Sequence, residues 1–187
     1  MAAQRIDSTA DVVEFLLEQH NRIRQLFAET ADAPTPQERE LKFFELRRLL
    51  AVHETAEEEI VHPRARRAID DGDKIVDARL AEENKAKHAL SELESIDVSS
   101  PEFTVKLAKL RDAVINHAGH EENEEFEQLR TRLEQADLER MRGIVEFAEK
   151  TAPTRPHPGV ESAAANMLAG PFAAMLDRAR DAISKPR

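Results

Sequence analysis

The stretch LRRLLAVHETAEEEIVHP, residues 46–63, carries a pattern that the chain repeats in LRDAVINHAGHEENEEF, residues 110–126. In each stretch a histidine is followed four residues later by a glutamate, and a leucine stands seven positions before the histidine. Residues four apart in an α-helix share one face, about one turn along. Each stretch therefore predicts a helix that directs an imidazole and a carboxylate toward the side of its core-facing leucine. The two pairs are His53 with Glu57 and His117 with Glu121.

The composition predicts a helical protein that binds neither nucleic acid nor membrane. The chain has 187 residues, 41% of them apolar and 34% charged, with five glycines, which is long enough to bury a substantial core. Its net charge of −10 should repel nucleic acid and anionic lipid alike. There is no cysteine, so any metal would have to be bound by histidine and carboxylate ligands.

Other features of the sequence predict a cytoplasmic location and weak near-ultraviolet absorption by the protein itself. The residues MAAQRIDSTADVVEF include charges and lack an apolar signal segment. No run approaches the length of a membrane span. Tyrosine and tryptophan are absent, so a near-ultraviolet or visible band in the pure protein would have to come from a bound group.

Four long helices are predicted from the spacing of the apolar residues. The first runs from about Ser8 to Ala31, with Ser8 as its N-cap. The second begins after Thr35, which caps it, with Pro36 in the first turn and Glu38 completing a capping box. Both helices repeat apolar side chains every three or four residues, so each has one core-facing side.

The third and fourth helices follow two clear breaks. Residues 70–73, Asp-Asp-Gly-Asp, predict a turn before the third helix, and residues 96–101 predict a loop before the fourth. Ser99 or Ser100 would cap the fourth helix, with Pro101 early in it. Because the loops are short, the helices should pack as an all-α, antiparallel up-down-up-down four-helix bundle.

After the fourth helix the sequence changes character. Residues 137–150 predict a short fifth helix, which completes a metal-binding domain of residues 1–150. Residues 151–187 predict a tail with a proline-rich linker and an amphipathic helix. We expect this helix to dock on the bundle or on a second subunit as a homodimer contact, with a lightly tethered tail as the alternative. Its apolar residues are Phe172, Met175, Leu176, Ala179 and Ile183.

Ionisable side chains interrupt the apolar face of every predicted long helix. Burying them without partners would be costly, and one arrangement that satisfies them together is a pair of cations bridged by carboxylates. Glu57 and Glu121 would be the bridges, because each lies one turn from a histidine. Hydrogen-bonded core histidines and solvated acidic faces are the alternative interpretation, but the coincidence on four helices favours metal. The predicted ligands are His20, His53, Glu57, Glu83, His117 and Glu121.

The frames EQHNRIRQLF, HETAEEEIVHP and HAGHEENEEFEQL make the chain resemble the hemerythrin-like (HHE cation-binding) family over residues 8–134. The segment TRPHPGVESAAANMLAGP resembles that of a bacterial, actinobacterial-type subgroup. The resemblance implies a four-helix bundle with a non-haem di-iron centre, so two iron ions are the expected cofactor, with manganese or zinc left open. The ligands that it implies are His20, His53, Glu57, His117 and Glu121.

The third helix departs from the family pattern. Relatives often have Glu-Glu-His at its start, where this chain has Glu82, Glu83 and Asn84. His88 lies five residues beyond Glu83, about 140° around the helix, and is expected on the surface. Glu83 faces inward and is the predicted ligand. Lys87 stands near the position of a second histidine in oxygen carriers, and should extend to solvent or pair with an acid.

Further polar residues near the predicted site are expected to be peripheral. Glu54 is interpreted as a solvated side chain, with an extra ligand as the alternative, and His62 is expected near the end of its helix. His120, with Glu124 one turn on, would be either exposed or a group that orients a ligand. Arg24, one turn from His20, is expected to pair with a core-side carboxylate. The apolar residues expected to shield a bound diatomic molecule are Val13, Leu49, Leu110 or Val114.

Two functions from different classes follow from this site. A set of three histidines and three carboxylates favours the ferric state of iron. Reversible oxygen carriage needs a ferrous pair, so this ligand set argues against simple oxygen storage. The first hypothesis is a hemerythrin-like di-iron protein that binds or reduces dioxygen, peroxide or nitric oxide in oxidative or nitrosative stress; catalase-like or ferroxidase-like turnover is left open. The alternative is a non-catalytic iron sensor or store whose fold depends on metal. A metal-free helical interaction protein is a third option.

Overall fold

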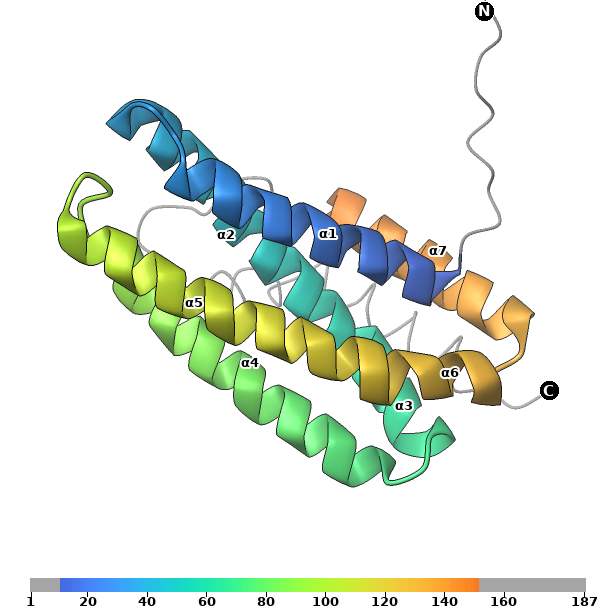
Figure 1. The fold of residues 1–187 in the computed structure, drawn as a ribbon. Coiled ribbons are helices and arrows are strands. Elements are labelled where there is room, and N and C mark those ends of the chain that lie inside the picture. The colour runs from blue at the N-terminus through green and yellow to red at the C-terminus, as the bar shows by residue number, and fades with distance from the viewer. Residues whose placement is uncertain (1–10, 152–187) are drawn as a thin grey trace, which may run out of the picture.

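The computed structural model describes residues 11–151, and all regular structure within that range is helical (Figure 1). The long helices are α1, α2, α4 and α5. Two π-helical turns, η1 and η2, and the shorter helices α3, α6 and α7 complete the described fold. The bounds are α1 Val12–Ala31, α2 Pro36–Ala56, η1 Glu57–Val61, α3 His62–Ala68, α4 Gly72–Glu94, α5 Pro101–His120, η2 Glu121–Phe126, α6 Glu127–Arg132 and α7 Gln135–Thr151.

The helices form a bundle. Helix α1 packs against α2 and α5, α4 packs against α5, and α3 continues the line of α2 and packs against α4. In Figure 1, α1 and α5 lie side by side in front of α2, and α4 runs along the lower side of α5. Helix α7, in orange, packs on α1 and α2. The predicted fold class, an all-α bundle with a short additional helix, is confirmed.

Side-chain caps set the starts of the first two helices. Asp11 accepts a hydrogen bond from the backbone N–H of Glu14 at 2.9 Å, so α1 begins directly after it. The predicted cap, Ser8, lies outside the described residues. Thr35 Oγ1 accepts from the Glu38 N–H at 3.2 Å, so Thr35 caps α2 as predicted. The Glu38 carboxylate accepts from the Thr35 hydroxyl at 3.0 Å, whereas in the predicted capping box it would accept from the Thr35 backbone N–H.

The starts of α4 and α5 are also set locally. Of the two candidate serines, Ser100 caps α5, accepting from the N–H of Phe103 at 3.1 Å. Before α4, Asp71 has a positive φ of 54°, which closes the predicted turn. Gly72 follows it, and a Cβ there would lie 2.7 Å from the backbone oxygen of Arg66. Glycine is therefore required where α4 starts against the end of α3.

The second and fourth long helices each continue through a π-helical turn. Helix α2 runs on into η1 and α3, and α5 runs on into η2 and α6. Each π turn begins at the glutamate of an H-x-x-x-E motif, Glu57 or Glu121. A π turn spans five residues, so the residue five places later, His62 or Phe126, returns to the same face. His62 is therefore inside the bundle in mid-helix, and the prediction that it lies near a helix end is wrong.

A proline explains the first of these turns. Proline has no N–H, and its ring clashes with the carbonyl four residues earlier in a regular α-helix. The wider turn of η1 ends just before Pro63, so the helix continues past it. In η2, which contains no proline, the widening lets Glu121, Glu125 and Phe126 all be buried.

Two apolar clusters fill the bundle, with ionisable side chains between them. On α1, Leu16 belongs to one cluster and Ile23 to the other, so His20 lies between the two. On α5, Val114 belongs to the second cluster, and His117 follows one turn later. We call the intervening groups the polar layer. Its members are His20, His53, Glu57, His62, Glu83, His117 and Glu121, all buried.

Within residues 11–151, no helix is both long enough and apolar enough to cross a bilayer.

One sequence prediction concerns the part of the chain that follows the bundle. The tail predicted for residues 151–187 lies outside the described residues from position 152 onward. Its linker, its amphipathic helix and its part in a homodimer therefore stay predictions.

Candidate metal centre

All six predicted ligands lie in the polar layer. They come from α1, α2, η1, α4, α5 and η2. Glu57, Glu83 and Glu121 have 0% exposed surface, and the three histidines are 2–6% exposed. Ionisable groups in such a dry interior need partners. The histidines are His20, His53 and His117.

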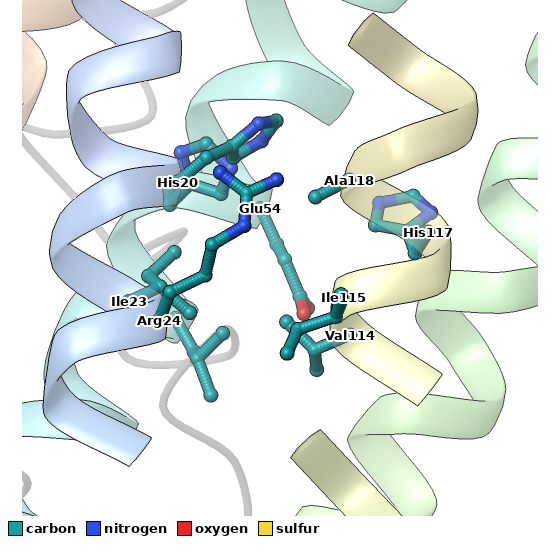
Figure 2. A pocket seen from close by; sticks show the side chains of 10 residues that line it. His20, Ile23, Arg24, Glu54, Val114, Ile115, His117 and Ala118 are labelled. Carbon is teal, nitrogen blue, oxygen red and sulfur yellow. The ribbon is translucent and has the colours of Figure 1, made fainter. Parts of the chain in front are cut away.

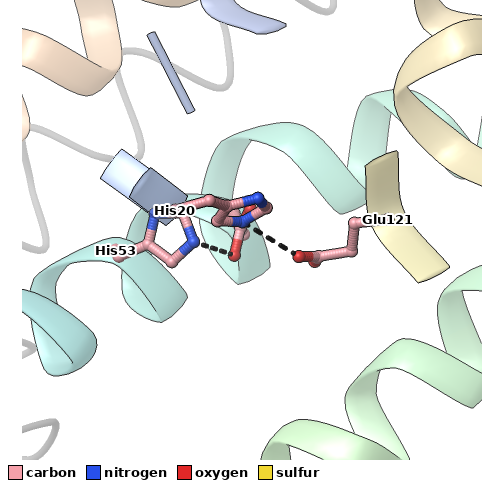
Figure 3. A group of neighbouring side chains, drawn as sticks. His20, His53 and Glu121 are labelled. Carbon is pink, nitrogen blue, oxygen red and sulfur yellow. Dashed lines mark ion pairs between the residues drawn. The ribbon is translucent and has the colours of Figure 1, made fainter. Parts of the chain in front are cut away.

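Four of these side chains surround a first candidate cation position. His20, His53, Glu57 and Glu121 each offer one ligand atom, and these atoms all lie within 4.8 Å of one another. His53 Nε2 is 3.2 Å from Oε2 of Glu57, and His20 Nε2 is 3.4 Å from Oε2 of Glu121. Figure 3 shows the imidazole of His20 directed toward the carboxylate of Glu121, with His53 beside it. Two imidazoles and two carboxylates are a suitable ligand set for a divalent transition metal.

A second candidate position shares Glu121 with the first. Ligand atoms of His62, Glu83 and Glu121 lie within 4.8 Å of one another, and His62 Nε2 is 2.7 Å from Oε1 of Glu83. His117 Nε2 is 3.2 Å from Oε1 of Glu121 and 4.0 Å from Oε1 of Glu83. Glu121 presents Oε2 to His20 and Oε1 to His117, and it belongs to both groups of ligand atoms.

The four histidines of the polar layer are all oriented in the same way. In each, Nδ1 lies within hydrogen-bond distance of a side-chain oxygen, to which it donates, while Nε2 faces the candidate positions. Histidines that bind metals in proteins are usually held in this manner, which fixes their tautomer. The Nδ1 contacts are His20 to Glu122 at 2.8 Å, His53 to Gln19 at 2.7 Å, His62 to Glu125 at 3.0 Å and His117 to Glu82 at 3.1 Å.

Several inward-facing atoms of the polar layer lack a hydrogen-bond partner among the described residues. An unpaired buried polar atom costs roughly 1–3 kcal/mol, and here such atoms gather around two points. Cations at those points would satisfy them together, so the residues fit a metal centre. The unpaired atoms are Nε2 of His20 and His117, both carboxylate oxygens of Glu57 and Glu121, and Oε2 of Glu83.

Without cations, protons must neutralise part of this layer. Burial, together with the nearby Glu121 and Glu83, raises the pKa of Glu57 well above its usual range. Burial also opposes charge on Glu121, but the imidazoles of His117 and His20, whose Nε2 atoms lie 3.2 and 3.4 Å from its oxygens, outweigh it and hold the pKa of Glu121 below its usual range. A bound cation would displace the protons, so metal binding should weaken in acid.

The imidazoles differ in their affinity for protons. Burial lowers the pKa of His62, but the carboxylates of Glu125 and Glu83 outweigh it and raise that pKa to about 10. In His117 burial is likewise outweighed by neighbouring glutamates, and its pKa rises to about 9. Burial lowers the pKa of His53 well below its usual value. The metal-free layer therefore holds protons on His62 and His117, whereas the imidazole of His53 is neutral.

Lys87 lies at the edge of the second position. Its Nζ contacts Glu58 and lies 3.7 Å from Oε2 of Glu83 and 3.8 Å from Oε2 of Glu54. Of the two expectations for Lys87, the structure shows the pairing with acids. Glu54 is 7% exposed, and burial raises its pKa to about 8. The interpretation of Glu54 as a solvated side chain is therefore wrong.

Two other histidines lie outside the polar layer. His88 is exposed, as expected from its position on the helix. His120 is 48% exposed, and its Nδ1 lies 3.0 Å from Oε1 of Glu82, the carboxylate that also holds His117. Glu124 is half exposed and lies 3.6 Å from Arg79. His120 is thus a surface residue that contacts the group orienting a candidate ligand.

A pocket opens onto the first position between α1, α2 and α5 (Figure 2). His20, His53 and His117 line it, and it has room for about one water-sized molecule. Arg24 also lines it and, as expected, pairs with a carboxylate, that of Glu122, at 2.7 Å. Val114 lines this pocket, as expected of a residue that shields a diatomic ligand, whereas Val13, Leu49 and Leu110 are not among its lining residues. Its apolar lining is Ile23, Leu50, Val114, Ile115 and Ala118.

Sequence reasoning missed His62 and the residues that orient the histidines. A signal for His62 existed: it stands five residues after Glu57, the spacing of a π turn, and directly before a proline. Glu122 and Glu125 lie in an acidic run that is typical of a solvated face. Gln19 lies beside His20 in the frame EQHNRIRQLF, but its residue type and position predicted no role.

A buried layer of histidines and glutamates inside such a bundle defines a class of metal-binding helical proteins. Residues 11–129 match the model of the hemerythrin HHE cation binding domain, and the chain belongs to that family. The predicted resemblance is confirmed, and cation binding is the property by which the family is described.

Two known proteins are similar to the chain. One is a hemerythrin HHE cation binding domain-containing protein from Mycobacterium kansasii, whose crystal structure gives a TM-score of 0.69 at 23% identity, covering 91% of this chain and 99% of that one. This likeness shows the shared fold. The other, from Nostoc sp., is named a DNA nickase and is 31% identical over 120 residues. These are 64% of this chain but 34% of the relative, so the chain spans about a third of that protein's length.

Proposed function

We propose that the chain is a non-haem di-iron protein that binds or reduces dioxygen, peroxide or nitric oxide in oxidative or nitrosative stress. The observation that supports this most is the sharing of Glu121 between two groups of buried ligands, since two-metal sites place their ions close together around shared groups. Imidazole and carboxylate ligands suit iron. Manganese and zinc would fit the same ligands.

Bound iron would supply redox chemistry at an open coordination position. The chain's own residues prepare that position: the Nδ1 hydrogen bonds direct four Nε2 atoms inward, and apolar side chains around the pocket limit the entry of water. With His62, four histidines and three carboxylates face the two positions, against the three and three expected from the sequence. The ligand set is therefore richer in histidine, and closer to that of an oxygen-binding site, than predicted.

The alternative is a non-catalytic iron sensor or store whose fold depends on metal. The unpaired atoms of the polar layer are consistent with it, because loss of cations leaves buried groups without partners. Adding peroxide to the iron-loaded chain separates the two. Repeated turnover with release of oxygen indicates an enzyme, a single stoichiometric bleach indicates binding, and unfolding after chelation indicates a sensor.

We do not propose DNA nicking, the activity in the name of the Nostoc relative, for this chain. A DNA-binding surface needs positive charge to contact phosphates, whereas this chain has a net charge of −10. We therefore propose no nucleic-acid partner and no membrane partner, and place the site's chemistry on small molecules that fit the pocket.

Metal analysis of the full chain, combined with an absorption spectrum, tests the proposal. We expect two irons per chain after purification from iron-replete cells, and a near-ultraviolet band from the bound iron that is easy to assign because tyrosine and tryptophan are absent. Glu121→Ala should remove both metals, because Glu121 serves both positions. A wild-type chain that binds one ion or none would contradict the proposal.

A further inference from the structure

The pocket in Figure 2 is lined by an arginine as well as by histidines. The side chain of Arg24 is 33% exposed, whereas His20, His53 and His117 are at most 6% exposed. The guanidinium is therefore nearer to solvent than the three imidazoles that line the same pocket. Apart from these residues and Glu54 the lining is apolar, so Arg24 is the one lysine or arginine among the described residues that line the pocket.

Hydrogen bonds hold the guanidinium in place beside His20. Nη2 of Arg24 donates to Oε1 of Glu122 at 2.7 Å, and Nη1 donates to Oδ1 of Asn21 at 3.2 Å. The same Oε1 of Glu122 accepts from Nδ1 of His20 at 2.8 Å. A guanidinium has five N–H groups, so these two contacts leave donors for a ligand. Figure 2 shows the guanidinium next to the imidazole at the pocket edge.

We propose that Arg24 makes this pocket selective for small monoanions, such as hydroperoxide, superoxide or azide, over neutral diatomic molecules. The inference rests on the proposed function, because the anion would bind at the first cation position and accept a hydrogen bond from Arg24. Hydrogen bonds between charged partners are about twice as strong as neutral ones. Neutral dioxygen or nitric oxide gains little from the guanidinium.

Because the protein as a whole is negatively charged, selectivity for anions requires a positive group at the pocket itself, such as the guanidinium of Arg24. The net charge of −10 repels anions at long range. Glu54 also lines the pocket, but Lys87 lies 3.8 Å from its carboxylate. Glu122 is paired with Arg24 itself. An approaching monoanion therefore finds its main attraction at the guanidinium and at the metal.

The test compares an anionic and a neutral probe on the full-length, iron-loaded chain. Azide binding to the air-oxidised form and nitric oxide binding to the reduced form are followed by absorption. Arg24→Gln should weaken azide binding about tenfold and leave nitric oxide binding unchanged, and Arg24→Lys should retain most of the azide affinity. Arg22→Gln is the matched control: Arg22 is on the same helix, 40% exposed and paired with Glu29 at 2.7 Å, and its loss should change neither affinity.

A third variant separates a direct effect of Arg24 from an effect through His20. Glu122→Gln removes the carboxylate that holds both residues but keeps the guanidinium, so azide affinity should be kept or increased. The proposal is overturned if Arg24→Gln binds azide like the wild type, if it loses both probes equally, or if Glu122→Gln loses as much azide affinity as Arg24→Gln. A wild-type chain that binds nitric oxide but prefers no anion overturns this inference alone, whereas one that binds neither probe overturns the proposed function.

Discussion

Glu83 and His88 lie five residues apart on α4 and have opposite environments. Glu83 has no exposed surface and contacts His62 at 2.7 Å, while His88 is exposed. Five residues turn an α-helix by about 140°, so the two side chains cannot face the same site. The third long helix therefore contributes a carboxylate, rather than an imidazole, to the polar layer.

The pair gives a direct test of the ligand from α4. Glu83→Ala should lower metal affinity by at least about tenfold, because even residues that only orient a ligand have effects of this size. His88→Ala should leave metal content unchanged. The measurement is metal per chain after dialysis against a weak chelator. A loss confined to His88→Ala would mean that α4 is rotated in the metal-bound protein.

His62 allows a second test at the same scale. His62→Gln should reduce the metal content toward one ion per chain, because the first position keeps His20, His53 and Glu57. Glu125→Gln should have a smaller effect, since the imidazole stays and loses one orienting contact. His120→Gln, at an exposed site, serves as the control. Two ions retained by His62→Gln would exclude His62 as a ligand.

Among the helices, what could be predicted depended on the range of the interaction. The caps at Thr35 and Ser100 are set by residues three positions away, so the sequence predicted Thr35 directly and Ser100 as one of two neighbouring candidates. The π turns were not predictable from apolar periodicity, which assumes 3.6 residues per turn. In a regular helix His62 would lie about 140° from Glu57; the added residue brings the two onto one face. The error about His62 follows from that assumption.

The junction between α3 and α4 makes a prediction about stability. Gly72→Ala should destabilise the protein by about 1–3 kcal/mol, as overpacking usually does, because the added methyl meets backbone oxygens of Arg66 and Ala65 at 2.7 and 2.8 Å. Gly143→Ala is the matched control: it lies in α7 with nothing within 4 Å of the added atom. It should stabilise by up to about 1 kcal/mol. Urea denaturation measures both, and equal effects would contradict the steric argument.

At the scale of the whole molecule, the polar layer depends on contacts that sequence patterns do not record. His20 and Glu122 are 102 residues apart, and His62 and Glu125 are 63 apart. Periodicity could place five or six side chains on inward faces, but the partner of each Nδ1 is set by how the helices pack. The sequence therefore predicted which side chains lie on the inner faces of the helices. It did not predict the side chains that accept hydrogen bonds from the imidazole Nδ1 atoms.

This layer should give the metal-free and metal-loaded proteins different responses to pH. In the metal-free chain the folded-state pKa is about 8 for Glu54, about 10 for His62 and about 9 for His117, each above its unfolded value. A group with a raised pKa contributes stability below its unfolded pKa and loses it as the pH rises through the folded pKa. The chelated protein should therefore lose stability as the pH rises above 7. His53, with a lowered pKa, affects stability only in more acid solution.

Melting temperatures of the chelated and iron-loaded chains from about pH 7 to pH 9 check this expectation. The chelated protein should melt roughly 5 °C lower at the alkaline end. The loaded protein should show little or no decrease, because cations have replaced the protons of the layer. Glu54→Gln should reduce the decrease in the chelated form, and Glu29→Gln, at a surface ion pair with Arg22, should leave it unchanged. A chelated protein that is equally stable across the range would mean that its buried layer does not hold these protons.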